Sequence, residues 1–452
     1  MVVDAKLSTA LRKRVDERAD EFLQWMVELV SIPSVSASGE GMRECAVALR
    51  RRMDSLGIRT ELLETGGEPM LWGEIGSGNG PRPIIYGHYD VQPALESEGW
   101  SHPPFSPQVR DGAIWGRGVG DNKGQLLTHL CALAAWQDVV GSPPPFTIKF
   151  VFDGEEEIGS PKTIPFIRDN PQWFAGDFVY CADGSTIGVW HPAMFLELHG
   201  LLYLELRATG AEAEWHSGSY GSVLPNPIHH MAGALRSLVD ETGHVLVPGF
   251  YDDVVPPTEV KRRLLDLLPP DFLTEPARYG AKRFATANPR EAMFLQPKMC
   301  VCGLIGGYTG EGVKTAVPTG ASAKLDITLT PSQTPEGITA LIRQHLDANG
   351  FDDVSITPLS VCPPVATRYD SLHFRLAESA MRNVWGKQPV IFPSIGGGGP
   401  MAAFAALGLE CICVPYAQAD LHEHSTEEHF SLEWFNNGIK ISAEMFRLMA
   451  AA

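Results

Sequence analysis

The 452-residue sequence has few cysteines, little positive charge and no long uninterrupted apolar run. Its eight cysteines form no Cys-x-x-Cys pair, which argues against a thiolate zinc knuckle or a thioredoxin-like redox site, and we expect buried, reduced thiols. Lys and Arg number 36 against 54 Asp and Glu, giving a formal net charge of −18. A field of that sign repels nucleic-acid phosphates and anionic membrane surfaces, so we expect neither as a partner.

Targeting and membrane signals are also missing. The most apolar stretch, residues 400–417, is interrupted by Gly408, Glu410 and Pro415, so it predicts a helix and a buried strand rather than a membrane span. The N-terminal residues are charged and amphipathic, without the apolar core and cleavage site of a signal peptide. We therefore expect a cytoplasmic protein, and its length favours two domains.

Short apolar runs alternate with helical stretches over the first 195 residues. The runs at 83–86, 146–152 and 178–182 predict strands. Apolar spacing over 11–30 predicts one helix, and residues 123–140 predict a largely buried helix after a glycine-rich loop. This alternation predicts an α/β domain with a largely parallel mixed sheet between helices.

A different pattern follows. Residues 200–207 and 321–329 alternate apolar and polar side chains, which is typical of half-exposed antiparallel strands. A helix is predicted at 335–349, and the α/β pattern resumes with a helix at 373–385 and a strand at 410–414. We therefore expect a discontinuous α/β domain, residues 1–199 and 363–452, with an inserted α+β domain at 200–362.

Clusters of polar residues follow several predicted strands. They are GHYD at 87–90, DGEEEIGS at 153–160, Asp183 and HEH at 422–424; GRGVGDNKG at 116–124 precedes the buried helix. The carboxyl ends of parallel strands can converge on one crevice, and His with carboxylates is the ligand set of a divalent metal site. Dinucleotide binding at 116–120 is disfavoured, because the third glycine is missing and Asp121 would repel a pyrophosphate.

The order of these clusters resembles, over almost the whole chain, the dizinc amidohydrolases that include carnosinase-like cytosolic dipeptidases, carboxypeptidase G, acetylornithine deacetylase and aminoacylase. The similar motifs are GHYDV at 87–91, GRGVGDNKG at 116–124, EEEIGS at 155–160, CADGS at 181–185, WHSGSYG at 215–221 and HEHSTEEH at 422–429. The stretch at 237–254 is especially similar to the carnosinase-type dipeptidase branch. The resemblance implies that residues 200–362 form a lid and dimerisation domain of a homodimer.

The resemblance also implies a pair of divalent metal ions, with Zn²⁺ as the default and Mn²⁺ or Co²⁺ compatible with the same ligands. Asp121 would bridge both ions, and the other implied ligands are His88 and Asp183 on one ion and Glu157 and His424 on the other. His422 is the rival of His424, but His424-Ser425 matches the family's His-Ser pair.

Three further residues receive catalytic roles from the resemblance. Asp90 would orient the imidazole of His88. Glu156 would be the general base that acts on a metal-bridging water, which leaves Glu155 outside the ligand set. His216 would donate to the developing oxyanion.

The substrate-binding positions match the family less well. Asn226 and Thr315 occupy substrate-side positions, but Thr328 stands where the dipeptidases have a carboxylate-binding arginine, and Gly398 stands where they have a serine. A hydroxyl cannot replace a bidentate guanidinium. Compensation could come from Lys314, Lys324 or Arg368.

We therefore expect a metal-dependent hydrolase of a peptide or amide bond in a small substrate, with a dipeptide as the leading candidate. One alternative is an N-acyl-amino-acid or other amide hydrolase whose substrates lack a free terminal carboxylate. The other is a catalytically silent metal- or peptide-binding protein, which the presence of Glu156 and all five implied ligands disfavours.

Overall fold

The protein is described from a computed structural model that covers residues 2–397 and 399–452. Its described residues form two compact units. Unit 1 lies within Met1–Leu196, Thr367–Phe392 and Gly399–Ala452, and unit 2 lies within Glu197–Ala366 and Pro393–Gly398. The domain boundaries predicted at 199/200 and 362/363 stay a proposal.

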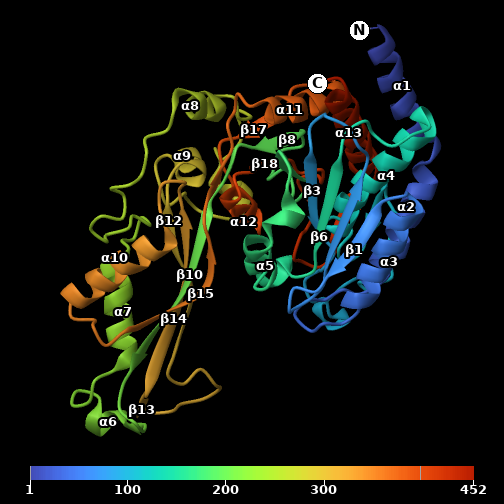
Figure 1. Cartoon of the computed structure of the whole chain (residues 1–452). Helices are drawn as coiled ribbons and strands as arrows, with labels where there is room; N and C mark the ends of the chain where they lie inside the picture. The colour runs from blue at the N-terminus through green and yellow to red at the C-terminus, as the bar shows by residue number, and fades with distance from the viewer. Residues whose placement is uncertain (1, 398) are drawn as a thin grey trace. The chain divides into compact units, whose positions relative to one another are not determined.

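Unit 1 is built on an eight-stranded sheet (Figure 1). In spatial order the strands are β1 (Arg59–Leu63), β2 (Met70–Ile75), β6 (Ile148–Asp153), β3 (Pro83–His88), β7 (Phe178–Cys181), β18 (Glu410–Cys413), β8 (Ala193–Phe195) and β17 (Val390–Phe392). β6, β3, β7 and β18 are mutually parallel neighbours, whereas β1–β2, β2–β6 and β18–β8 pair antiparallel. This confirms the predicted largely parallel mixed sheet.

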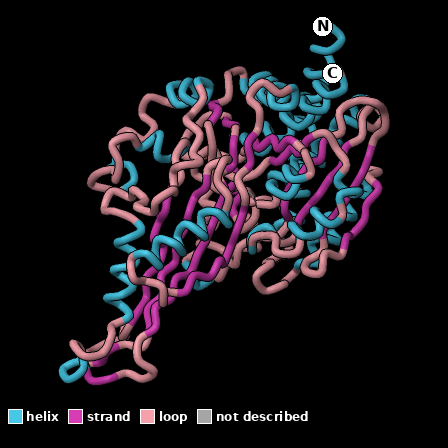
Figure 2. The backbone as a smooth tube through the Cα atoms, turned by 60° about the vertical axis from the view of Figure 1, so that its left-hand side comes forward, coloured by secondary structure: helices cyan, strands magenta, loops and turns pink. Residues whose placement is uncertain are grey.

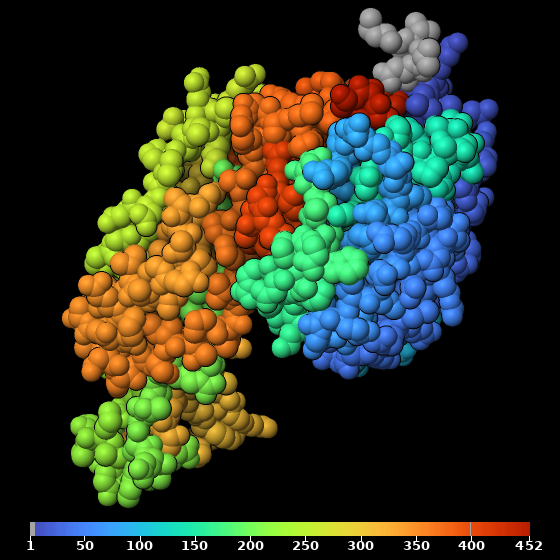
Figure 3. Space-filling view, viewed as in Figure 1, coloured from blue at the N-terminus to red at the C-terminus, as the bar shows by residue number. Residues whose placement is uncertain are grey.

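Helices cover both faces of this sheet (Figure 1). They are α1 (Val2–Glu17), α2 (Ala19–Val30), α3 (Met42–Ser55), α4 (Lys123–Val140), α5 (Thr163–Asp169), α11 (Leu372–Trp385), α12 (Met401–Ala406) and α13 (Leu432–Ala450). The C-terminal helix α13 packs against α1 and α4, and Figure 3 shows its red surface beside the blue N-terminal helices. The prediction of one helix over 11–30 is wrong, because Arg18 (φ −108°, ψ 12°) leaves the helical conformation and separates α1 from α2.

A small antiparallel sheet completes unit 1. Its strands are β19 (His429–Ser431), β5 (Ala113–Trp115) and β4 (Gln108–Arg110). None of the helices formed by the described part of the chain has the length and apolarity needed to cross a membrane.

Unit 2 contains a four-stranded antiparallel sheet whose strands run side by side in Figure 2. Their order is β12 (Lys298–Gly306), β14 (Gly320–Leu329), β10 (Gly200–Thr209) and β15 (Ser355–Cys362). Every second residue of β10 and β14 is buried against α7 (Pro227–Leu238) and α10 (Pro335–Ala348). The predicted alternation is thus confirmed, and it exists because one sheet face is covered by helices while the other carries the more exposed side chains.

Shorter elements complete unit 2. β9 (Glu197–Leu198) pairs with β16 (Val365–Ala366), and β11 (Trp215–His216) pairs with β13 (Ala316–Val317). The helices α6 (Ser217–Tyr220), α8 (Glu259–Asp266) and α9 (Pro289–Phe294) lie in the connections between strands.

The cysteine prediction needs a correction. Six of the eight cysteines are buried, but Cys300 and Cys302 are exposed on β12. The register of β12 shifts between Val301 and Gly303, and residues 300–302 are all exposed. Cys300 and Cys302 are two residues apart and so share the strand face opposite to buried Met299, which exposes both thiols.

Candidate metal centre

Five loops of unit 1 carry the side chains that the sequence singled out. His88 ends β3, Asp183 follows β7, and Glu157 lies in a short 3₁₀ helix, Glu156–Ile158, directly after β6. His424 lies in the loop beyond β18, and Asp121 lies in the loop that leads into α4. Because β6, β3, β7 and β18 are parallel neighbours, their carboxyl ends bring these loops to one edge of the sheet.

The side chains meet around Asp121. Its Oδ1 lies 3.1 Å from His88 Nε2, and its Oδ2 lies 2.9 Å from His424 Nε2. His88 Nε2 is also 3.7 Å from Asp183 Oδ2, and His424 Nε2 is 3.0 Å from Glu157 Oε2. The structure therefore brings together all five side chains that the resemblance implied as ligands, with one oxygen of Asp121 directed toward each histidine.

Asp90 connects His88 with the turn that carries Glu156 and Glu157. Its buried carboxylate accepts the backbone N–H of Glu156 at 3.2 Å and that of Glu157 at 3.0 Å. His88 Nδ1 lies 3.1 Å from the backbone oxygen of Asp90 and 3.3 Å from its carboxylate. Asp90 thus fixes the ring of His88 through its backbone oxygen and carboxylate, and the start of the glutamate-containing turn through its carboxylate.

The three consecutive glutamates have different surroundings. The carboxylate of Glu155 accepts backbone N–H groups of Glu68 and Lys162, at 3.0 and 2.9 Å, and so is used in loop structure. The carboxylate of Glu157 accepts the side-chain amide of Gln92 at 2.8 Å and contacts His424. Glu156 lies between them, and among the described residues no side chain donates a hydrogen bond to its carboxylate.

The two candidate histidines of the last loop also differ. His424 contacts Asp121 and Glu157, whereas the ring of His422 packs edge-on against His429 with centroids 5.3 Å apart. Both have left-handed backbone conformations, with φ of 59° for His422 and 57° for His424. Such conformations are costly for residues other than glycine and often occur at functional sites.

The donor set fits divalent metal ions. His88 Nε2 is buried and, although it lies 3.1 Å from Asp121, it makes no hydrogen bond of acceptable geometry. A ring nitrogen and carboxylate oxygens that face one another in this way leave room for a shared cation. His88, Asp121 and Glu157 each offer a ligand atom, and these atoms lie within 4.8 Å of one another.

The electrostatics of the cluster also favour cation binding. Burial raises the pKa of Asp183 to about 6 and that of Glu156 well above its ordinary value. Hydrogen bonds with Asp121 and Glu157 raise the pKa of His424 to about 11. The carboxylates here carry more negative charge than the protein's own cations neutralise, which favours the uptake of protons or metal ions.

Glu428 is a structural residue of the site that sequence reasoning did not single out. Its fully buried carboxylate accepts Arg117 Nη1 at 2.8 Å and the backbone N–H groups of Gly118, Gly120 and Asp121 at 3.0 to 3.1 Å. Glu428 therefore shapes the glycine-rich loop that presents Asp121. The only sequence signal was its place in the motif at 422–429.

Two other contributors were also missed. Asn122 donates to Asp183 Oδ1 at 2.7 Å, which orients that carboxylate. At Gly399 (φ 42°) a Cβ atom would lie 2.7 Å from Glu156 Oε1. The glycine-rich loop thus leaves space for the side chain of Glu156, which only the folded arrangement reveals.

The remaining candidates lie in unit 2. His216 is exposed on β11, and Ser217 N donates to Thr315 O at 3.0 Å, so His216 and Thr315 belong to adjacent segments. Asn226 caps α7, with its Oδ1 accepting Ile228 N at 2.9 Å. The functional roles of these residues stay predictions.

The altered carboxylate-binding positions can be located in part. Thr328 lies on β14 opposite Lys298 on β12, whereas Gly398 lies outside the described residues. Lys314 pairs with Glu214. Arg368 is 3.1 Å from Asp370. Two of the three proposed compensating cations are therefore already engaged by carboxylates.

Comparison with known proteins places these features in context. The chain matches the family model described as peptidase family M20/M25/M40 over residues 84–448. It is 28% identical to the Beta-Ala-His dipeptidase of Rattus norvegicus, covering 96% of this chain and 93% of the relative. It is 27% identical to the Cys-Gly metallodipeptidase dug1 of Schizosaccharomyces pombe, covering 94% and 95%.

Solved structures agree with these matches. The M20 family metallo-carboxypeptidase Sso-CP2 from Sulfolobus solfataricus superimposes with a TM-score of 0.89 at 32% identity, covering 96% of this chain and 100% of that one. Human carnosine dipeptidase 1 gives a TM-score of 0.82 at 26% identity, covering 99% of both chains.

Proposed function

The chain belongs to peptidase family M20/M25/M40, and from this premise we propose that it is a metal-dependent dipeptidase. The observation that carries the proposal is the position of Asp121, which lies within 3.1 Å of His88 and 2.9 Å of His424 with Glu157 beside the second histidine. Relatives that match 94% or more of this chain are named as dipeptidases. These similarities support a dipeptide as substrate.

We propose that the cluster holds two divalent ions, with zinc as the default. His88 and Asp183 would hold one, Glu157 and His424 the other, and Asp121 both. When bound, such ions polarise a carbonyl group and make water more acidic. Asp121, Glu157 and Asp183 supply three negative charges, so a pair of divalent cations brings the buried centre close to neutrality.

Glu156 is proposed as the general base. Its backbone is fixed by the hydrogen bond to Asp90, and its carboxylate has no donor among the described side chains, so it is available to a bound water. Burial raises its pKa well above the ordinary value, which suits a group that accepts a proton from water and then delivers it to the leaving nitrogen. His216 is proposed to stabilise the oxyanion.

A homodimer through unit 2 is part of the proposal. β12 is an edge strand that exposes Leu304 and Ile305, with 57% and 63% of their surface accessible. An apolar edge strand favours pairing with a second copy. The exposed thiols of Cys300 and Cys302 suit a reducing, cytoplasmic compartment.

Thr328 supports a second candidate function. Because its hydroxyl cannot form the bidentate contact of an arginine, Thr328 favours a substrate without a free terminal carboxylate, as for an N-acyl-amino-acid or other amide hydrolase. We would compare turnover of a simple dipeptide with that of its C-terminal amide, using protein loaded with Zn²⁺ or Mn²⁺. A strong preference for the free acid supports the dipeptidase, whereas equal or better cleavage of the amide supports the second candidate.

A further inference from the structure

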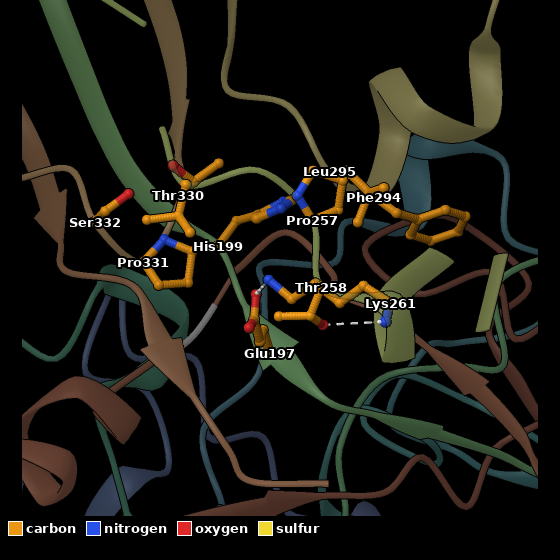
Figure 4. A pocket seen from close by; sticks show the side chains of 11 residues that line it. Glu197, His199, Pro257, Thr258, Lys261, Phe294, Leu295, Thr330, Pro331 and Ser332 are labelled. Carbon is orange, nitrogen blue, oxygen red and sulfur yellow. Dashed lines mark hydrogen bonds and ion pairs between the residues drawn. The ribbon is translucent and has the colours of Figure 1, made fainter. Parts of the chain in front are cut away.

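Unit 2 contains a cavity of about 320 Å³ that is lined entirely by its own residues. Figure 4 shows Glu197, His199 and Lys261 at this cavity, with Pro257 and Pro331 among the side chains around them. The volume is at the lower end of the range of small-molecule sites. It suits a molecule of about the size of an amino acid or a dipeptide.

The cavity wall carries one charge of each sign. Lys261 Nζ lies 2.7 Å from Glu197 Oε2, and only 20% and 10% of these two side chains are accessible. An ammonium has three N–H donors and a carboxylate accepts through both oxygens. The pair therefore keeps two donors on Lys261 and Oε1 of Glu197 beyond its single contact, on two side chains that are largely buried.

His199 adds an unused acceptor. Ser394 Oγ contacts Phe294 O, and since a carbonyl oxygen can only accept, the hydroxyl proton of Ser394 lies in that contact. Ser394 Oγ must then accept the proton of His199 Nε2, 2.8 Å away. Nδ1 of His199 is consequently an unprotonated lone pair, buried and without a hydrogen-bond partner in the described structure.

The surroundings of His199 keep its imidazole ring neutral. Burial, together with the charge of Lys298, lowers the pKa of His199 to about 4. Thr258, which also lines the cavity, caps α8 by accepting Lys261 N at 3.3 Å, so Lys261 lies in the first turn of that helix. The N-terminal end of a helix favours negative charge, which adds to the attraction of Lys261 for an anionic group.

We propose that this cavity binds a small zwitterion, an α-amino acid or a dipeptide, with its carboxylate at Lys261 and its ammonium at Glu197. The apolar groups of Val255, Phe294 and Leu295 in the lining accommodate an apolar side chain. Amino acids and dipeptides are the products and substrates of the proposed reaction. The link between this ligand and the reaction thus rests on the proposed function, whereas the binding of a zwitterion to the cavity does not.

The test is titration calorimetry of the full-length, metal-loaded protein with leucine, 4-methylpentanoate, which lacks the ammonium, and leucinamide, which lacks the carboxylate. We expect leucine to bind at least about tenfold more tightly than either analogue. Glu197→Gln should weaken leucine and leucinamide at least about tenfold and leave 4-methylpentanoate unchanged. Lys261→Met should weaken leucine and 4-methylpentanoate and leave leucinamide unchanged.

Further variants guard against loss of folding. Ser332→Trp keeps the ion pair but places a large ring at an exposed position of the cavity lining, and it should also abolish leucine binding. Arg278→Met removes an exposed ion pair with Asp271 elsewhere in unit 2 and should change nothing. Circular dichroism and thermal unfolding confirm that each variant is folded.

Leucyl-leucine, titrated into the Glu156→Gln variant so that it is not consumed, tells the two sources apart. Only binding that is lost when Ser332→Trp is added to this variant belongs to the cavity. If leucine is the tighter of the two by that measure, the ligand is the free amino acid; if leucyl-leucine is the tighter, the ligand is the dipeptide. Leucine affinity that is unchanged in Glu197→Gln, Lys261→Met and Ser332→Trp overturns the proposal. A protein that binds leucine as expected but hydrolyses no peptide refutes the proposed function and leaves the cavity assignment standing.

Discussion

Buried charge is arranged differently in the two units. In unit 1, the carboxylates of Asp121, Glu156, Glu157 and Asp183 gather around His88 and His424. In unit 2, one carboxylate, Glu197, meets one ammonium, Lys261, at 2.7 Å. The first cluster has negative charge left over, whereas the second is balanced within the protein.

The difference determines what each region can bind. Surplus carboxylate charge in a buried place is stable only with protons or cations, and burial accordingly raises the pKa of Asp183 to about 6. A balanced pair needs no ion and can offer each of its charges to a molecule that carries both signs. Unit 1 is therefore suited to metal ions and unit 2 to a neutral zwitterion.

The largest effect is expected from removing the carboxylate of Asp121, because the negative charge of unit 1 is centred on it. In Asp121→Asn, only one of the two carboxylate oxygens that face His88 and His424 remains as an oxygen, and the negative charge is lost. We therefore expect loss of bound metal and of detectable peptidase activity. Metal content by mass spectrometry and turnover of a dipeptide measure both effects. Asp138→Asn, which alters an ion pair with Arg14 and Arg18, is the control and should keep metal and activity. Full activity of Asp121→Asn would contradict the ligand assignment.

Glu156→Gln should separate chemistry from metal binding. The amide cannot accept a proton, so turnover should fall at least about 10²-fold while the metal content stays unchanged. Steady-state kinetics and metal analysis on the same sample test the two halves of this expectation. The control Glu64→Gln, on the surface of unit 1, should have the turnover and metal content of the wild type. A variant that retains normal turnover would remove Glu156 from the role of base.

Glu428→Gln tests the support beneath the metal centre. The substitution removes the charge that pairs with Arg117 and places an amide group where the carboxylate accepts several N–H donors. We expect the free energy of unfolding to fall by about 2 kcal/mol, measured by urea denaturation. Glu433→Gln at the exposed start of α13 should cost little. An equally small change at Glu428 would show that the loop is held by other contacts.

Acidification should lower the free energy of unfolding by a smaller amount, because His199 of unit 2 is held neutral in the folded protein. The pKa of His199 in the folded protein, about 4, is below the ordinary value of 6.5, so the unfolded chain binds the proton more strongly. This contribution to stability is complete above pH 6.5 and is lost as the pH falls toward 4. Between pH 6.5 and 5.5 the loss is about 1 kcal/mol.

Urea denaturation at several pH values compares the wild type with His199→Asn. The variant should lose about 1 kcal/mol less than the wild type over this interval. His244→Asn, at an exposed position of the same unit, is the matched control. Parallel pH profiles for all three proteins would contradict the neutral, buried state of His199.

Local sequence predicted most elements that position the metal centre. The helix expected at 123–140 is α4 (Lys123–Val140), and the strand expected at 178–182 is β7 (Phe178–Cys181). Both are apolar on all sides, and their lengths distinguish a buried helix from a short buried strand. The break at Arg18 was missed, because the apolar face continues through it and periodicity does not detect a one-residue change of backbone direction.

The sequence by itself determined which residue types gather at the ends of parallel strands, since that depends on local patterns and on the order of the motifs. Only the tertiary structure showed that Glu428 supports the loop of Asp121, that Gly399 leaves space for Glu156, and that Glu197 meets Lys261 at a cavity. These contacts join residues tens to hundreds of positions apart, and no local propensity encodes such a distance. Packing of the whole chain decides them, because burial makes each charge depend on the partner that folding brings to it.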